Sequence, residues 1–340
     1  MTERILVTGA GGFVGGHLIR ALSSRGGDIR IVAGRHAGAQ GLAGMQGLAG
    51  AQGLAGPDPA AGCESVDLDI TDTAQVRAAI RAVRPTALVH LAAVAALQEA
   101  RLDPERTFRI NLTGTMNLAA AVMQEAPEAR FLFVGTSEVY GGTFRTRTTA
   151  LDETALLDPT NPYAASKAAA DLLIGQMARD GLRSVRLRPF NHTGPGQSTA
   201  FVVPAFAAQV ARIEAGLQPP VLQVGNLDAL RDFLDVRDVV DAYVRAIFAP
   251  DLARGQVLNI ASGVPQRIGD ALDGLRALAR CEIRIEPDPA RMRPNDTPLA
   301  IGDATRARAA LGWAPGIAWE TTLADTLDFW RENVAREQAR

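Results

Sequence analysis

The stretch Gly9-Ala10-Gly11-Gly12-Phe13-Val14-Gly15 decides the fold. Gly9, Gly12 and Gly15 are spaced three residues apart, directly after a predicted strand at Arg4–Thr8 and at the start of a predicted helix at Gly12–Ser24. Residues without a Cβ atom allow a tight turn and a close approach of a pyrophosphate to the helix N-terminus, where free N–H groups favour negative charge. The pattern predicts a dinucleotide-binding loop, with cofactor contacts from Gly9, Gly12, Phe13, Val14 and Gly15.

Strands and helices are predicted to alternate after this loop. Short apolar strands that alternate with amphipathic helices require helical crossovers, and therefore a parallel sheet covered on both faces. The prediction is an α/β fold of the Rossmann type, a doubly wound parallel sheet. The predicted strands after the first are Ile29–Ala33, Glu64–Leu68, Ala87–Leu91, Phe131–Gly135 and Ser184–Leu187, and the predicted helices after the first are Thr73–Val83, Asp103–Glu125 and Tyr163–Arg179.

The character of the chain changes at Pro189, where turn-rich segments with many prolines begin. We therefore predict a dinucleotide-binding domain at residues 1–188 and a smaller α/β substrate lobe made mainly of residues 189–340. Short strands are expected there at Val221–Val224, Val257–Ile260 and Ile283–Ile285. A return of part of this segment to the main sheet is left open.

A low-complexity insertion is predicted at about residues 36–62. The sequence Gln-Gly-Leu-Ala-Gly begins at Gln40, Gln46 and Gln52, a six-residue period. A β-helical coil is a conceivable interpretation, but the repeats offer leucines and no larger apolar residues, which bury too little surface to offset the entropy of their glycines. A mobile insertion is favoured over a functional flap.

Composition excludes several classes of protein. The 340 residues are 47% apolar, which is enough for a hydrophobic core. Because 35 Lys and Arg balance 37 Asp and Glu to a net charge of −2, we expect binding neither to nucleic acid nor to an anionic membrane surface. Cys63 and Cys281 lie far apart, which predicts two buried thiols in a reducing compartment and no metal site. No leader or membrane-spanning stretch is recognised, so a cytoplasmic protein is expected.

The end of the second predicted strand bears on the choice of cofactor. It reads Ala33-Gly34-Arg35-His36, without the acidic residue that would accept hydrogen bonds from an unphosphorylated ribose. A guanidinium suits a phosphate, which favours NADP(H), although Arg35 as a solvated loop residue is the alternative. Further cofactor contacts are expected where other strands end, at Asp69, Ile70, Leu91, Ala92, Ala93 and Pro189.

Tyr163 and Lys167 are candidate catalytic residues. They lie four apart at the start of a predicted helix, so both project from one face. A phenol exchanges protons poorly at pH 7 unless a neighbouring cation stabilises its anion, which the ammonium can do. Thr136, at the end of the fifth predicted strand, can supply a hydroxyl to the same reacting oxygen.

Together these motifs make the chain resemble the extended short-chain dehydrogenase/reductase family over its whole length. The resemblance implies that Thr136, Tyr163 and Lys167 form the active-site triad and that Asn111 helps to position the lysine. It also implies a homodimer in which the helices at Asp103–Glu125 and Tyr163–Arg179 pair into a four-helix bundle. The motifs that carry it are Thr8–Gly15, His90-Leu91-Ala92-Ala93, Asn111, Thr136-Ser137-Glu138-Val139-Tyr140-Gly141 and Tyr163-Ala164-Ala165-Ser166-Lys167.

The C-terminal half is similar to the GDP-4-keto-6-deoxy-D-mannose reductases, relatives of the GDP-mannose 4,6-dehydratases. The matching segments are Arg188–Gln197, Phe201–Pro204, Val224–Leu227, Arg231–Asp238 and Arg293-Pro294. The resemblance implies that Asn191, Arg231 and Arg293 hold the diphosphate and ribose of a sugar nucleotide. It places Val203, within Phe201–Phe206, near the base, and Ser137 and Glu138 near the sugar. Arg237, between Asp235 and Asp238, is predicted to form a structural ion pair.

The expected reaction is NADPH-dependent reduction of the 4-keto group of a GDP-4-keto-6-deoxyhexose, giving GDP-D-rhamnose or its C4 epimer GDP-6-deoxy-D-talose. Two alternatives stay open. Glu138 stands where related dehydratases keep a base, so a nucleotide-sugar 4-epimerase or 4,6-dehydratase that retains NAD(P) is the first. The second is a dinucleotide-sensing binding protein, a class that usually lacks the Tyr and Lys pair.

Overall fold

A seven-stranded parallel sheet forms the larger part of the molecule. The computed structural model describes residues 2–36, 60, 62–291 and 297–339. Neighbouring strands follow the order β10-β6-β5-β4-β1-β2-β3, with the crossover to either side of β1 that is typical of a doubly wound sheet. The predicted Rossmann fold is confirmed. The strands are β1 (Glu3–Thr8), β2 (Ile29–Arg35), β3 (Glu64–Asp67), β4 (Ala87–His90), β5 (Arg130–Val134), β6 (Ser184–Pro189) and β10 (Gln256–Ile260).

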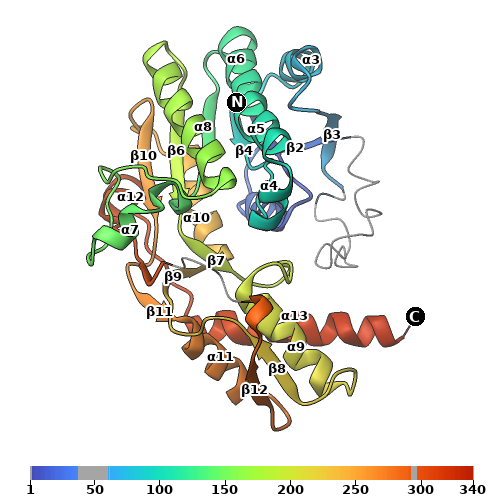
Figure 1. Cartoon of the computed structure of the whole chain (residues 1–340). Coiled ribbons are helices and arrows are strands. Elements are labelled where there is room, and N and C mark those ends of the chain that lie inside the picture. The colour runs from blue at the N-terminus through green and yellow to red at the C-terminus, as the bar shows by residue number, and fades with distance from the viewer. Residues whose placement is uncertain (1, 37–59, 61, 292–296, 340) are drawn as a thin grey trace.

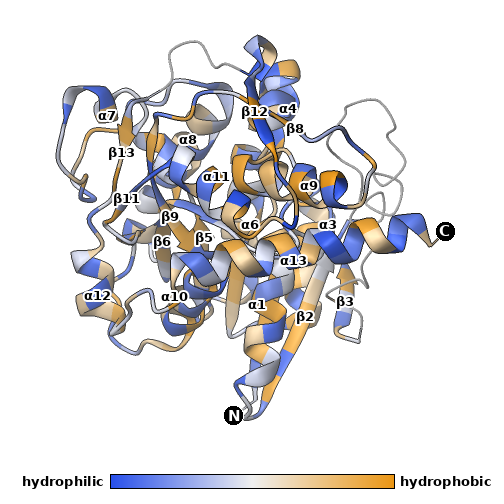
Figure 2. Ribbon diagram, turned by 90° about the horizontal axis from the view of Figure 1, so that it is seen from below, coloured by the Kyte–Doolittle hydropathy of each residue, from blue (hydrophilic) through white to orange (hydrophobic). Residues whose placement is uncertain are grey.

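Helices cover both faces of this sheet (Figure 1). One face packs against α3 (Thr73–Val83), α6 (Thr115–Glu125) and α8 (Pro162–Arg179). The other packs against α1 (Phe13–Ser24), α10 (Val236–Phe248) and α12 (Thr305–Leu311). Figure 2 shows apolar residues concentrated along central strands such as β5 and β6. The two hydrophobic cores fix the sheet and leave its carboxyl edge for the site.

A smaller lobe lies beyond that edge (Figure 1). Helices α9 (Val202–Glu214), α11 (Ile268–Ala277) and α13 (Trp319–Gln338) share a core with a two-stranded sheet. That sheet pairs β8 (Val221–Val224) with β12 (Arg284–Pro287). Between the two parts, β9 (Leu230–Asp235) pairs with β7 (Asn191–Thr193), β11 (Pro265–Arg267) and β13 (Leu299–Ala300).

The predicted strand at Val257–Ile260 does not belong to the smaller lobe. As β10 it pairs in parallel with β6, with Leu258 opposite Leu187, and Leu258, Asn259 and Ile260 are fully buried. Helices α10 and α12 also pack on the large sheet. The segment after Pro189 therefore builds parts of both lobes, because a buried β6 needs a hydrogen-bonding neighbour on its outer edge.

The predicted helix at Asp103–Glu125 is divided into three segments. Helix α5 (Pro104–Phe108) passes into a π-helical turn at Arg109–Gly114, and α6 follows. The wider turn contains Asn111 and Gly114, both buried. Such turns are rare and occur often at functional sites. A short helix, α4 (Leu97–Leu102), contacts α5, whereas another, α7 (Thr143–Thr146), contacts β13.

The prediction of two buried thiols was wrong. Cys281 is exposed because it lies in the loop between α11 and β12, and Cys63 is only half-buried where it precedes β3. Both thiols are free. The repeat that begins at Gln40, Gln46 and Gln52, which was predicted to be mobile, lies outside the described residues.

Candidate active site

The glycine loop between β1 and α1 is shaped for close backbone approach. Gly9 has a φ of +69°, and a Cβ atom there would lie 2.8 Å from the backbone nitrogen of Ala92. A Cβ atom on Gly15 would clash with the carbonyl oxygens of Gly9 and Ala10. Gly12 caps α1 without a side-chain hydrogen bond, and the first turn carries no acidic residue. This cradle fits a dinucleotide pyrophosphate at the N-terminus of α1.

Arg35 ends β2 beside the loop that follows β3. Its side chain is half-buried, and its Nη2 donates to the carbonyl oxygen of Ala60 at 2.9 Å, so it is not a freely solvated loop residue. Nδ1 of His36 lies 4.0 Å from a carboxylate oxygen of Asp69. Burial opposes ionisation of Asp69, but two hydrogen bonds from Thr71 hold its pKa below the usual value. A cation and an ionised carboxylate therefore flank the expected adenosine end.

The other predicted cofactor contacts lie at the carboxyl edge of the sheet. Leu91, Ala92 and Ala93 follow β4 and are half-buried, like Asp69 after β3. Ile70 and Pro189 are buried. Phe13 and Val14 begin α1 and are half-buried. The sheet topology thus brings the predicted residues of four strand ends to one edge, where open α/β sheets bind ligands.

Thr136 and Tyr163 meet in the structure. Thr136 caps a short 3-10 helix, η2 (Ser137–Tyr140), and its Oγ1 accepts from the backbone N–H of Glu138 at 3.2 Å. Tyr163 lies in the first turn of α8, after the cap residue Asn161. Burial of the phenol raises the pKa of Tyr163 to about 12, a hydrogen bond with Thr136 opposes the rise, and the nearby charge of Glu138 adds to it. The phenol is therefore protonated at neutral pH.

Lys167 lies one turn further along α8 and is only 3% exposed. Its Nζ donates to the carbonyl oxygen of Val134 at 2.5 Å and lies 4.6 Å from the centroid of the Phe133 ring. Burial lowers the pKa of Lys167 to about 8, while Asp171 opposes the shift. The expected depression of the Tyr163 pKa is not found, because burial outweighs the favourable contacts of the phenol.

Asn111 contacts the neighbour of the lysine rather than the lysine itself. Its Nδ2 donates to Ser166 Oγ at 2.9 Å and to the carbonyl oxygen of Val94 at 3.1 Å, and its Oδ1 accepts from the Val94 N–H at 2.8 Å. Ser166 in turn donates to the carbonyl oxygen of Tyr163 at 2.7 Å. Asn111 thus joins the π-helical turn, the loop after β4 and the first turn of α8.

His90 links this region to the glycine loop, a role that the sequence did not predict beyond its place in a motif. The Thr115 hydroxyl donates to the carbonyl oxygen of Asn111, so it accepts from His90 Nε2 at 2.9 Å. His90 Nδ1 then accepts from Thr8 Oγ1 at 2.8 Å. Burial lowers the pKa of His90 to about 3, with Lys167 adding to the effect, so the ring is neutral.

The predicted substrate residues are distributed over the junction between the lobes. Asn191 begins β7, which pairs with β9, and Ser137 and Glu138 lie on η2. Arg231 lies in β9, where its Nη1 donates to the carbonyl oxygens of Leu230 at 2.9 Å and Thr297 at 2.7 Å. Val203 lies near the start of α9 and is buried in the core of the smaller lobe. Arg293 lies outside the described residues.

The acidic residues near Arg231 have other partners. Asp232 accepts from the N–H groups of Ser262, Gly263 and Gly302. Asp235 receives two guanidinium hydrogen bonds from Arg237, which also pairs with Asp325 at 2.7 Å. The predicted structural ion pair of Arg237 is confirmed.

Comparison with known proteins agrees with this geometry. The family model described as GDP-mannose 4,6 dehydratase matches residues 6–326. The chain belongs to this family. It is 39% identical over 254 residues to GDP-6-deoxy-D-mannose reductase of Pseudomonas aeruginosa, covering 74% of this chain and 83% of that protein.

Solved structures of family relatives share the whole fold. The structure of RMD from Pseudomonas aeruginosa complexed with NADPH is similar with a TM-score of 0.81 and 32% identity, covering 97% of this chain and 99% of that one. UDP-glucose 4-epimerase of Thermus thermophilus in complex with NAD gives a TM-score of 0.78 and 27% identity, covering 97% and 99%. The family member described here therefore has the extended short-chain dehydrogenase/reductase fold.

Proposed function

We propose that the protein reduces the 4-keto group of GDP-4-keto-6-deoxy-D-mannose with NADPH, to GDP-D-rhamnose or its C4 epimer GDP-6-deoxy-D-talose. The observation that carries the proposal is the proximity of Thr136 and Tyr163, with Lys167 on the same helix as Tyr163, at the carboxyl edge of a dinucleotide-binding sheet. The 39% identity to a GDP-6-deoxy-D-mannose reductase supports the substrate class. The neighbour complexed with NADPH supports the cofactor.

The residues of the site have distinct tasks in this reaction. A bound nicotinamide dinucleotide supplies the hydride, which adds to C4 of the sugar. Thr136 donates a hydrogen bond that polarises the carbonyl, and Tyr163 gives its phenol proton to the C4 oxygen as negative charge develops there. The Lys167 ammonium then stabilises the tyrosinate that remains. Gly9, Gly12 and Gly15 form the backbone cradle for the pyrophosphate. Arg35 would contact a phosphate on the ribose.

The sugar nucleotide is assigned to the junction of the lobes. Arg231 and Arg293 supply positive charge for the diphosphate in a protein whose net charge is only −2. We assign hydrogen bonds with the sugar nucleotide to Asn191, the base to the start of α9 near Val203, and the sugar to the side of Ser137 and Glu138.

Net oxidation of the cofactor distinguishes this reaction from the alternatives. An epimerase or 4,6-dehydratase would use Glu138 and return the hydride to the same sugar. Purified protein should instead oxidise one NADPH for each GDP-4-keto-6-deoxy-D-mannose consumed, with the product identified by NMR of the hexose. Sugar conversion without net NADPH oxidation would favour the alternatives, and dinucleotide binding without turnover of any GDP-sugar would favour a sensing protein.

The reduction is expected to slow as the pH rises through about 8. Below its pKa of about 8, Lys167 carries the charge that stabilises the tyrosinate, and above this value the charge is lost. The turnover number measured at saturating substrates should therefore show an alkaline limb near pH 8. NADPH binding measured over the same range is the control for folding, and turnover that stays constant well above pH 8 would contradict the assignment.

Arg231→Ala should weaken binding of GDP by about 100-fold, because a charge-assisted contact to the diphosphate is lost. The unfolding free energy without ligand should change by no more than about 1 kcal/mol. Calorimetry with GDP and thermal melting measure the two quantities. Arg237→Ala is the matched control, since it breaks the ion pair with Asp235 and should lower the melting temperature without changing GDP affinity. A lower melting temperature of Arg231→Ala with unchanged GDP affinity would assign Arg231 a structural role.

A homodimer is proposed through the helices that contain the active site. Leu102 on α4, Met116 on α6 and Leu172 on α8 are 64%, 42% and 63% exposed, and these helices pack together on one side of the sheet. We expect Leu172→Asp to shift the protein from dimer to monomer in sedimentation, because a charge would be buried in the four-helix bundle. Leu156→Asp, at a 72% exposed position outside these helices, should leave the dimer intact. A monomeric wild type would disprove the proposal.

No described helix has the length and apolar character needed to cross a membrane.

A further inference from the structure

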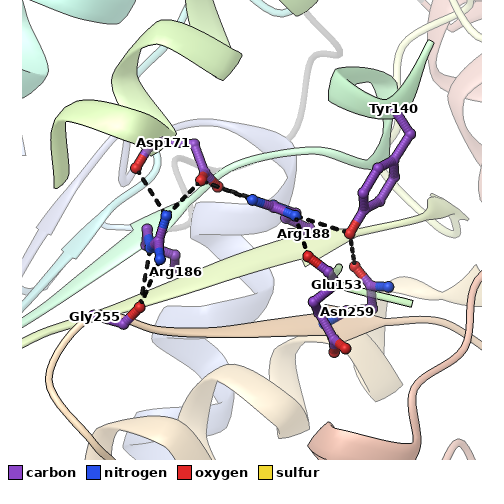
Figure 3. A network of polar contacts seen from close by, with 7 residues as sticks. All are labelled: Tyr140, Glu153, Asp171, Arg186, Arg188, Gly255 and Asn259. Atoms are coloured by element: carbon purple, nitrogen blue, oxygen red, sulfur yellow. Dashed lines mark hydrogen bonds and ion pairs between the residues drawn. The ribbon is translucent and has the colours of Figure 1, made fainter. Parts of the chain in front are cut away.

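A buried polar network connects the catalytic helix to the turn that follows Thr136 (Figure 3). Asp171 on α8 is fully buried and receives three guanidinium hydrogen bonds. Arg188 on β6 donates through Nε at 3.0 Å and Nη2 at 2.9 Å, and Arg186 donates through Nη1 at 2.8 Å. The bidentate contact fixes the plane of the Arg188 guanidinium as well as its position.

The same Arg188 guanidinium also donates a hydrogen bond to Tyr140. Nη1 of Arg188 donates to the Tyr140 hydroxyl at 3.0 Å, and the hydroxyl donates to Oδ1 of Asn259 on β10 at 2.7 Å. The backbone N–H of Asn259 donates to Glu153 Oε1 at 2.8 Å. Tyr140, Asp171 and Asn259 are fully buried and Arg188 is 4% exposed, so water does not compete for these contacts.

The two ends of the network are attached to the two halves of the active site. Asp171 lies one turn after Lys167 and two turns after Tyr163 on α8, so its position and theirs move together. Tyr140 is the last residue of η2, the turn that Thr136 caps and that contains Glu138. We infer that Arg188 and Tyr140 are positioning residues, which hold Thr136 in place beside Tyr163.

The kinetic test of this positioning role rests on the proposed reduction, because it measures turnover. A buried ion pair can also serve stability alone, and it contributes little when compared with apolar packing. The two roles differ in one measurable respect. A positioning residue acts through Thr136, so its loss should matter only while Thr136 is present, whereas a purely structural residue has the same effect in either background.

The test is a double-mutant cycle of Tyr140→Phe and Thr136→Ala. Phenylalanine keeps the ring among Phe144 and Phe190 and removes only the hydroxyl that Arg188 holds. We expect Tyr140→Phe to lower kcat about 10-fold with the KM for NADPH changed less than about twofold, since a small displacement of a reacting group is costly. In the Thr136→Ala background the same change should cost less than about twofold.

Tyr243→Phe is the matched control. Its hydroxyl is also buried in the same core, and it makes no hydrogen bond among the described residues. Its removal should leave kcat unchanged. Equal effects of Tyr140→Phe in both backgrounds would overturn the inference, as would unchanged kcat with a lower melting temperature, or a variant that does not fold.

A second measurement needs no turnover, so it separates this inference from the proposed function. The chain contains three tyrosines, and a ¹³Cζ label on them gives three NMR signals. The signal lost in Tyr163→Phe identifies Tyr163. It should move in Tyr140→Phe, because the position of Thr136 relative to the Tyr163 phenol changes, and an unmoved signal would overturn the positioning role. A wild type without ketone reduction would instead refute the proposed function alone.

Discussion

Tyr163→Phe should lower turnover by at least about 100-fold, the lower range for loss of a general acid. The phenol is protonated at neutral pH, since burial raises its pKa to about 12, and it lies beside Thr136. Phenylalanine retains the ring and removes only the proton donor. The dissociation constant for NADPH should therefore remain close to that of wild type. Steady-state kinetics with GDP-4-keto-6-deoxy-D-mannose and fluorescence titration of NADPH measure the two effects.

A variant of Lys167 tests the same proton transfer as Tyr163→Phe. Lys167→Met should also reduce turnover, because the cation that stabilises the tyrosinate is lost. The Tyr163→Phe and Lys167→Met losses should be far from additive, since both variants disable the same proton transfer. Near-native turnover of purified Tyr163→Phe would refute the mechanism.

Arg35→Asp should reverse the cofactor preference from NADPH to NADH, by about 100-fold or more in the ratio of kcat/KM values. The change removes a guanidinium partner of the ribose phosphate, introduces repulsion, and supplies an acceptor for the unphosphorylated ribose. Arg35 is held at the end of β2 by the carbonyl oxygen of Ala60, so the new carboxylate would stand at the same strand end.

The cofactor test requires both dinucleotides to be titrated against both proteins. Arg20→Asp, an exposed change on the surface of α1, has the same effect on net charge and should leave the preference unaltered. A wild type that already prefers NADH would show that the residues at the end of β2 do not select the phosphate.

Local patterns predicted most of the larger lobe. The glycine spacing, the apolar strands and the Tyr163 and Lys167 spacing are each contained within a few residues, and the structure places them as expected. The π-helical turn at Arg109–Gly114 was not predicted, because one additional residue in a helical turn leaves the apolar pattern almost unchanged.

Long-range pairing explains the remaining differences. Nothing near Val257–Ile260 indicates that its neighbour is β6, which lies about 70 residues earlier. Asp171, Arg188 and Asn259 are likewise ordinary polar residues in the sequence, and only the fold reveals that they share one buried network. Cys281 was placed wrongly because residue type alone favours burial of cysteine, whereas its loop is exposed.

The repeated passage of the chain between the lobes has a consequence for how the molecule unfolds. The segment after Pro189 supplies β7 and α9 to one side, returns as α10 and β10, leaves again as α11, and returns as α12 before α13. A fragment ending at residue 188 would have an unpaired β6 edge and an uncovered α1, both prone to aggregation. Neither lobe can therefore melt as an independent unit, and heat or denaturant should disrupt both in one cooperative transition.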